Sequence, residues 1–113
     1  MTYLDNTASN KQCVQKGAVE FSSQVDRAYL NTDHSIELVD PQIARRTNVV
    51  KTNSLTTVVW NPWKEGVSFM IDMGDEEWMQ MACVEACNIR DFAIELQPGQ
   101  QHTMRVTISV DKL

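Results

Sequence analysis

The sequence predicts an all-β protein, an antiparallel β-sandwich formed by one domain over residues 1–113. Three observations lead to this fold class. Apolar and polar residues alternate with a period of two along most of the chain, as they do in strands with one dry and one wet face. Short turn-prone segments separate the alternating runs, and only residues 64–78 lack the alternation.

The alternation is clearest near the C-terminus. Every second residue of Thr103–Val110 is apolar, and Phe92–Leu96 alternates in the same way. Between them lies Pro98-Gly99, a pair that suits a type II turn because proline fixes one dihedral angle and glycine accepts the positive one. We therefore expect residues 92–96 and 103–110 to pair as antiparallel strands.

The remaining strands follow from the same pattern. Ile43–Thr52 is more polar and is expected at a sheet edge, whereas Leu55–Trp60 and Met79–Ala86 carry apolar or β-branched residues on both faces and are expected inside a sheet. Lys64–Trp78, with two glycines and an acidic run, predicts a loop with a helical turn. Three shorter strands are expected upstream: Ala18–Phe21, Asp26–Leu30 and Ser35–Val39.

Composition excludes several classes of function. The net charge is -5, and no stripe of basic residues suggests nucleic-acid binding. The longest basic run, Arg45-Arg46, is expected on a solvated strand edge. No apolar stretch approaches the ~18 residues of a membrane span, and residues 1–11 lack the apolar core of a secretion signal, so a cytoplasmic protein is expected.

The three cysteines are an odd number, which favours reduced thiols. Cys83 and Cys87 could form a metal site with His34 or His102, but their spacing fits no common zinc pattern. We therefore expect no metal.

Glu85 stands alone in the apolar run Met81–Cys87. A buried, unpaired carboxylate costs on the order of several kcal/mol. Desolvation would raise the pKa of this carboxyl group toward neutrality, as a general base requires. Two structural alternatives remain open: a partner arginine, Arg27 or Arg90, or a strand end at which Glu85 reaches water.

Several motifs together resemble one family. In the same order as that family, the chain contains five segments: Thr2–Asp5 (TYLD), Val25–Asn31 (VDRAYLN), Trp60–Trp63 (WNPW), Asp72–Trp78 (DMGDEEW) and Met81–Glu85 (MACVE). They are similar to the C-terminal part of the glucose-6-phosphate 1-epimerases, the hexose-6-phosphate mutarotases of the aldose 1-epimerase superfamily. Several motifs in the right order are specific, although each alone is weak.

The resemblance implies a large antiparallel β-sandwich that binds a sugar in a cleft. It places Glu85 on the family's catalytic base and Asp26 on an acidic residue that lines the sugar site. The base removes the proton of the anomeric hydroxyl while an acid protonates the ring oxygen, and opening, rotation and closure of the ring give the other anomer. This reaction needs no metal or cofactor.

The chain also departs from the family. The family's acid is a histidine and arginines hold its phosphate, and all of them come from the half that precedes the segment like Thr2–Asp5. His34 and His102 do not fall on the catalytic position and are expected at the surface. Cys87 replaces a small residue and is expected to narrow the space beside Glu85. We therefore expect the chain to be too short for the whole enzyme.

Three functions fit these observations: a truncated mutarotase-like domain that binds a sugar or sugar phosphate without catalysis, a half-enzyme completed by a partner chain, and a non-catalytic interaction module. We also expect a homodimer, because open sheet edges and apolar surface invite association. In the competing expectation the chain stays monomeric, and Lys51, Arg45 and Arg46 guard the edge. The apolar residues concerned are Trp60, Trp63, Phe69, Met70, Met79 and Met81.

Overall fold

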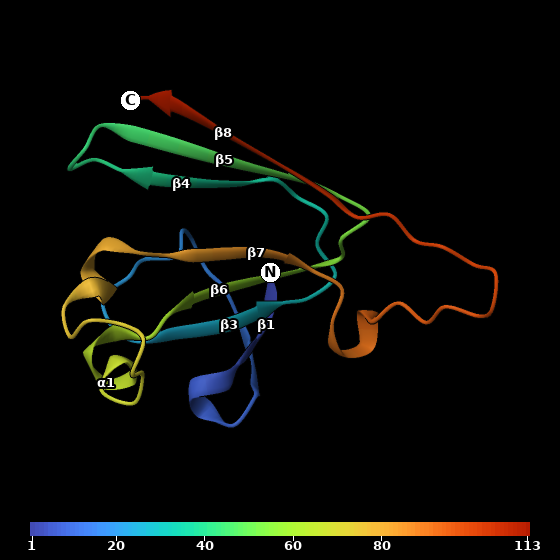
Figure 1. Cartoon of the computed structure of the whole chain (residues 1–113), viewed down its shortest axis with the longest axis horizontal. Helices are drawn as coiled ribbons and strands as arrows, with labels where there is room; N and C mark the ends of the chain where they lie inside the picture. The colour runs from blue at the N-terminus through green and yellow to red at the C-terminus, as the bar shows by residue number, and fades with distance from the viewer.

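The computed structural model describes all residues, 1–113, as two antiparallel β-sheets joined at one end (Figure 1). One sheet has five strands in the order β2-β1-β3-β6-β7, and the other has three in the order β4-β5-β8. The predicted all-β, antiparallel architecture is confirmed. None of the helices has the length and apolar character needed to cross a membrane.

In the five-stranded sheet, β6 lies between β3 and β7, as expected for Leu55–Trp60. Met79–Ala86 was also expected inside a sheet, and this prediction is wrong, because the strand in this region, β7, begins only at Cys83 and lies at the sheet edge. The β1–β2 hairpin was not predicted, because each of its strands is only four residues long and half of their residues are polar. Ala18–Phe21 is not a strand; Val19 and Phe21 pack against the core without joining a ladder. The strands are β1 Thr2–Asp5, β2 Lys11–Val14, β3 Val25–Tyr29, β6 Thr56–Asn61 and β7 Cys83–Cys87.

The three-stranded sheet contains β4 Ile36–Asp40, β5 Arg45–Thr52 and β8 Arg105–Lys112. The expectation that β5 is an edge strand is wrong, because β4 and β8 pair with its two sides. Its polar side chains other than Lys51 stand on exposed or partly exposed faces of the sheet rather than at its edge.

The predicted pairing of residues 92–96 with 103–110 is also wrong. Residues 93–96 form no regular structure, and β8 pairs instead with β5. The turn between them does form: the Gln100 N–H donates to the Gln97 carbonyl at 3.0 Å, and Gly99 has a φ of 83°. Alternation showed which side chains share a face, but it did not identify the partner strand.

Helical structure is confined to short segments. The region expected to contain a helical turn holds α1 (Trp63–Val67) and the 3-10 turn η2 (Glu77–Gln80). Two further 3-10 turns, η1 (Asn6–Ala8) and η3 (Arg90–Phe92), flank the five-stranded sheet.

The core is small and lies in the five-stranded sheet. Only 14 of 113 residues are buried, and the apolar cluster consists of Tyr3, Val25, Tyr29 and Val59. In the three-stranded sheet Val49 is the one buried apolar residue, and every residue of β8 is exposed. Much of the sheet surface therefore remains uncovered.

A buried lysine joins the two sheets. The side chain of Lys51 in β5 is 6% exposed, and its ammonium group donates to the Thr32 carbonyl at 2.7 Å, the Ser54 hydroxyl at 3.2 Å and the Thr56 carbonyl at 2.9 Å. These bonds use all three donors of the ammonium group. Burial lowers the pKa of Lys51 from its usual value. The alternative in which Lys51 guards an exposed edge is wrong.

We predict that Lys51→Met lowers the free energy of unfolding by about 3 kcal/mol, because three hydrogen bonds at a buried site are lost while the apolar stem is kept. The Thr32 carbonyl loses the Lys51 donor, and the Thr56 carbonyl keeps only the Ser54 hydroxyl. Urea unfolding measures the loss. The control is Lys16→Met at an exposed site, which we expect to change stability by less than about 0.5 kcal/mol. Equal stability of the two variants would contradict a structural role for Lys51.

Candidate functional site

Strand register places Asp26 and Glu85 on the same face of the five-stranded sheet. Asp26 in β3 lies opposite Trp60 in β6, and Glu85 in β7 lies opposite Val58. Residues directly opposite each other share a face, as do residues two apart on one strand. We call this face, which carries Asp26, Val58, Trp60 and Glu85, the outer face, because the opposite side chains, including Val59 and Val84, line a cavity toward β4.

The two carboxylates are close but not adjacent. Since β6 separates their strands, their backbones are about 10 Å apart across the sheet, with a further offset along the strands. Trp60 and Val58 provide the surface between them. Such a span leaves room for a ligand to meet both carboxylates over an apolar floor.

Glu85 is exposed, so the predicted burial is wrong. The physical reason is that β7 is an edge strand, and nothing covers its outer face at this position. Arg27 does not pair with Glu85: it lies on the opposite face and donates to the Gln15 side chain at 3.0 Å. Arg90 forms no ion pair with it either, because Arg46–Glu37 is the one salt bridge in the structure. Glu85 reaches water, in the middle of an edge strand rather than at a strand end.

Asp26 is held in place by a polar network that the sequence did not reveal. The half-buried Asp26 carboxylate accepts a hydrogen bond from the Asn6 amide at 2.9 Å. Arg90 donates in turn to the side-chain oxygens of Asn6 at 3.2 Å and Asn10 at 3.1 Å. The Arg90 guanidinium therefore reaches the turn that holds Asp26 while having no carboxylate partner of its own.

The turn that carries Asn6 has a local cause. The Asp5 carboxylate caps η1 by accepting from the Thr7 N–H at 3.0 Å, and the Asn10 N–H donates to the Asp5 carbonyl at 2.9 Å. Asn10 has a φ of 61°, a conformation that asparagine tolerates better than most residues. An Asp-Asn-Thr cap signal was therefore present in the sequence. The contact between this turn and Arg90, which is 84 residues from Asn6, could not be predicted from the sequence.

Two thiols flank Glu85 along β7 on the outer face. Burial raises the pKa of both Cys83 and Cys87, and the charge of Glu85 raises them further. Both groups therefore remain neutral thiols near neutral pH. Cys87 shares this face with Glu85, and its narrowing of the space beside Glu85 stays a prediction.

Neither histidine lies on the outer face near Glu85. His34 is exposed at the cavity on the other side of the five-stranded sheet, and His102 is exposed in the loop before β8. Their predicted surface positions are confirmed.

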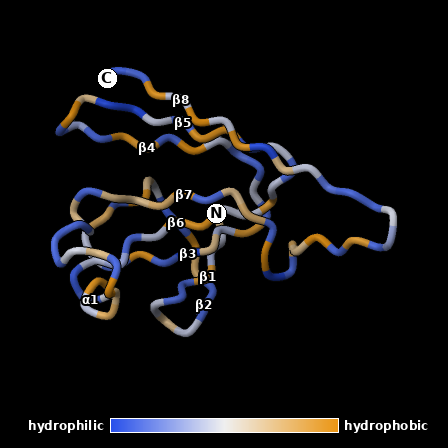
Figure 2. Tube along the Cα trace, in the orientation of Figure 1, coloured by the Kyte–Doolittle hydropathy of each residue, from blue (hydrophilic) through white to orange (hydrophobic).

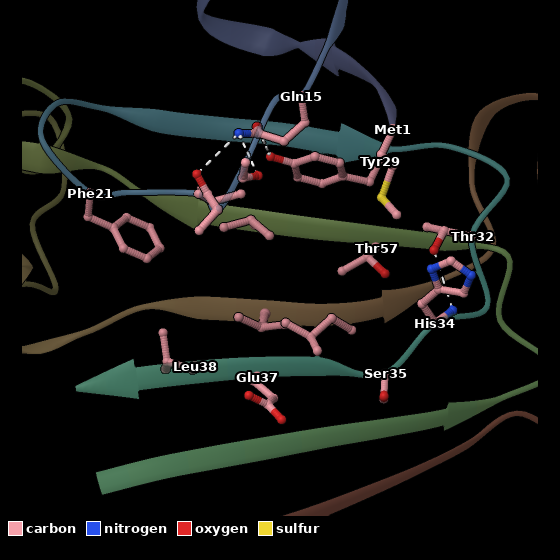
Figure 3. Close-up of a pocket in the computed structure, with 16 residues that line it drawn as sticks. Met1, Gln15, Phe21, Tyr29, Thr32, His34, Ser35, Glu37, Leu38 and Thr57 are labelled. Atoms are coloured by element: carbon pink, nitrogen blue, oxygen red, sulfur yellow. Dashed lines mark hydrogen bonds between the residues drawn. The ribbon is translucent and has the colours of Figure 1, made fainter. Parts of the chain in front are cut away.

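A cavity of about 510 Å³ opens between the sheets (Figure 3). Tyr29, whose hydroxyl donates to the Gln15 side chain at 2.8 Å, and Thr57, whose buried hydroxyl has no hydrogen-bond partner, contribute to its wall. Neither Asp26 nor Glu85 lines it. This cavity and the predicted sugar site are thus on opposite faces of one sheet.

Comparison with known proteins agrees with the resemblance in the motifs. Residues 3–109 match the model of the family described as aldose 1-epimerase. This chain belongs to the aldose 1-epimerase family. It is also 34% identical over 110 residues to a protein of Cenchrus ciliaris named "Putative glucose-6-phosphate 1-epimerase", an alignment that covers 96% of this chain and 33% of the relative. The chain thus spans about a third of the length of that curated relative. No solved structure matches it.

Within this family member, the Trp60–Trp63 motif is mainly architectural. The buried Asn61 side chain donates to the carbonyls of Trp78 at 2.9 Å and Met81 at 2.8 Å, and accepts from the Trp63 N–H at 2.8 Å. The Trp63 and Trp78 rings pack with centroids 4.4 Å apart. Asn61 therefore fixes both ends of the loop that leads into β7 and Glu85.

We predict that Asn61→Ala lowers the free energy of unfolding by about 3 kcal/mol, because three hydrogen bonds are lost at a buried site. Tryptophan fluorescence should also shift to longer wavelength as Trp63 and Trp78 gain access to water. Gln80→Ala, in the same loop but exposed and without a side-chain hydrogen bond, is the control and should leave both readouts unchanged.

Proposed function

We propose that this chain forms the carboxylate part of a mutarotase site and binds a hexose or hexose 6-phosphate on its outer face. The observation that carries the proposal is the shared face of Asp26 and Glu85 in a member of the aldose 1-epimerase family. The name of the Cenchrus ciliaris relative favours a 6-phosphorylated sugar.

Each carboxylate has a different role in this proposal. Glu85 is exposed and forms no ion pair, so it can accept the proton of an anomeric hydroxyl. Asp26, fixed by Asn6, orients the sugar by accepting hydrogen bonds from its hydroxyls. Arg90 offers a guanidinium to an anionic substituent such as phosphate.

We propose further that the chain alone binds sugar but does not catalyse. Anomer exchange also needs an acid to protonate the ring oxygen. Both histidines lie away from the outer face near Glu85, and the thiols beside Glu85 have pKa values raised by burial, which makes them weak acids.

The alternative is a half-enzyme that a second polypeptide completes. It is favoured by the relative's length, since two thirds of that protein have no counterpart in this chain. The two proposals differ in one measurable respect: a complementary polypeptide restores anomer exchange only in the second.

We also propose a reducing, cytoplasmic location. Cys83 and Cys87 are four residues apart on one strand, so their Cα atoms are about 13 Å apart, too far for a disulfide between them. Thiols that cannot pair within the chain are best kept reduced.

We predict that Asp26→Asn and Glu85→Gln each weaken glucose 6-phosphate binding about tenfold, because each removes a charge-assisted hydrogen bond. Titration of ¹⁵N-labelled protein, followed by NMR, measures the dissociation constant and shows whether shifts cluster on β3 and β7. Glu95→Gln, which removes one charge from an exposed loop, is the control and should bind normally. If millimolar glucose 6-phosphate caused no chemical-shift changes on the outer face, the binding proposal would be wrong.

We predict that the isolated chain leaves the anomer exchange rate of glucose 6-phosphate at the buffer value, because loss of the acid alone removes about 10²- to 10⁴-fold of catalysis. Two-dimensional exchange NMR measures this rate. An enzyme-level rate that Glu85→Gln abolishes would show that the chain is complete in itself. A rate that appears only after adding a polypeptide equivalent to the rest of the relative would establish the half-enzyme.

A further inference from the structure

The C-terminal strand β8 is an unprotected sheet edge. It pairs with β5 on one side only, so the backbone groups on its other side lack strand partners. All eight of its residues are exposed. Natural edge strands are usually short, charged, kinked by proline or bulged, but residues 106–110 of β8 contain no charge and no proline.

β8 also presents apolar side chains that are only partly covered. Val106, Ile108 and Val110 are 42%, 65% and 59% exposed. They share the face of the sheet on which Val49 is buried, because Ile108 lies opposite Val49. Figure 2 shows the alternation of apolar and polar residues along β8, and Figure 1 places this strand on the side of its sheet remote from the five-stranded sheet.

The strand is held rigid at both ends. The Leu113 N–H donates to the Ala44 carbonyl at 2.9 Å, and the Asn53 amide donates to the Thr103 carbonyl at 2.9 Å. A second strand that pairs with β8 would therefore meet a backbone that is already ordered, so pairing would cost less conformational entropy.

We propose that β8 pairs with β8 of a second copy of this chain, antiparallel about a two-fold axis through Ile108. The dimer then contains one continuous six-stranded sheet, three strands from each copy. This inference is independent of the proposed sugar site.

The side chains of β8 are self-complementary in this register. Ile108 faces Ile108 of the second copy, Val106 faces Val110, and Arg105 faces Asp111, so between residues 105 and 111 each apolar residue meets an apolar one and each charge meets its opposite. Lys112, the last residue of β8, lies beyond this stretch and faces Met104. Two ion pairs form at the ends of the paired strands, related by the two-fold axis. Asp111 also accepts a hydrogen bond from Asn48 at 2.8 Å, which holds its carboxylate on the polar face.

The other open sheet edges, β7, β4 and β2, are not self-complementary. Self-pairing of β7 about its centre would bring Glu85 against Glu85, which is repulsive. Self-pairing of β4 about Leu38 would place Ile36 against Asp40. The fourth edge, β2, has only four residues and would oppose Lys11 to Val14. Charge and hydrophobic patterning therefore select β8.

Sedimentation equilibrium tests the dimer, with charge variants to locate its interface. The wild type should fit a reversible equilibrium between 12.9 kDa and twice that mass. Arg105→Asp places like charges opposite each other at both ends, and we expect it to weaken dimerisation about tenfold. Adding Asp111→Arg to that variant restores opposite charges and should restore the wild-type affinity.

Two further variants separate the interface from general effects on folding. Ile108→Lys places two ammonium groups on the axis and should weaken the dimer at least about a hundredfold, whereas Val39→Lys on the β4 edge, also at an exposed site, should not. Ile108→Cys should form a disulfide between residues 108 of two copies, identified by mass spectrometry, because facing Cα atoms in antiparallel strands are about 4.5–5.5 Å apart. A single 12.9 kDa species at all concentrations, or a dimer indifferent to the β8 variants, would overturn the proposal.

Discussion

The arrangement of the two sheets depends on the hydrogen bonds that the ammonium group of Lys51 donates. The chain leaves the five-stranded sheet after β3 and returns to it before β6, and Lys51 binds the carbonyls of both segments, at Thr32 and Thr56. Ser54, which Lys51 also contacts, donates to the Cys87 carbonyl at 2.8 Å and so connects the same point to the end of β7. A charge costs free energy when it is buried, and it is tolerated here because every donor has an acceptor.

This junction explains why the family motifs are largely architectural. The junction fixes the end of β7, and Asn61 fixes the loop that precedes its start, so the strand that carries Glu85 is positioned from both sides. Asp26 depends on a separate support, the Asn6–Arg90 network. The proposed sugar site rests on one exposed and one half-buried carboxylate, whereas most of the recognisable sequence holds their strands in register.

Sequence reasoning succeeded where the information was local and failed where it depended on distant segments. Period-two alternation located β8, a run of apolar and β-branched residues located β6, and Pro98-Gly99 gave the turn, because these features are encoded within a few residues. The partner of β8 was not predicted, because alternation shows which face a side chain is on but not which strand lies beside it. The apolar run around Glu85 suggested a buried strand inside a sheet, but β7 is an edge strand, and whether a distant segment covers its outer face is not encoded in the run itself. Arg90 was considered only as a partner of Glu85, and its contact with Asn6 is a product of the fold.

The proposed sugar site and the proposed dimer interface make no competing demands on the chain. Asp26 and Glu85 lie on the outer face of the five-stranded sheet, which is turned away from β4, whereas β8 belongs to the other sheet and is separated from β4 by β5. Pairing through β8 therefore leaves the exposure of both carboxylates unchanged. Pairing also adds contacts to the sheet with the smaller core, because the three-stranded sheet contributes only Val49 to the buried apolar residues. Association on one sheet can thus stabilise the junction at Lys51, and through it the strand that carries Glu85, without covering the face on which a sugar would bind.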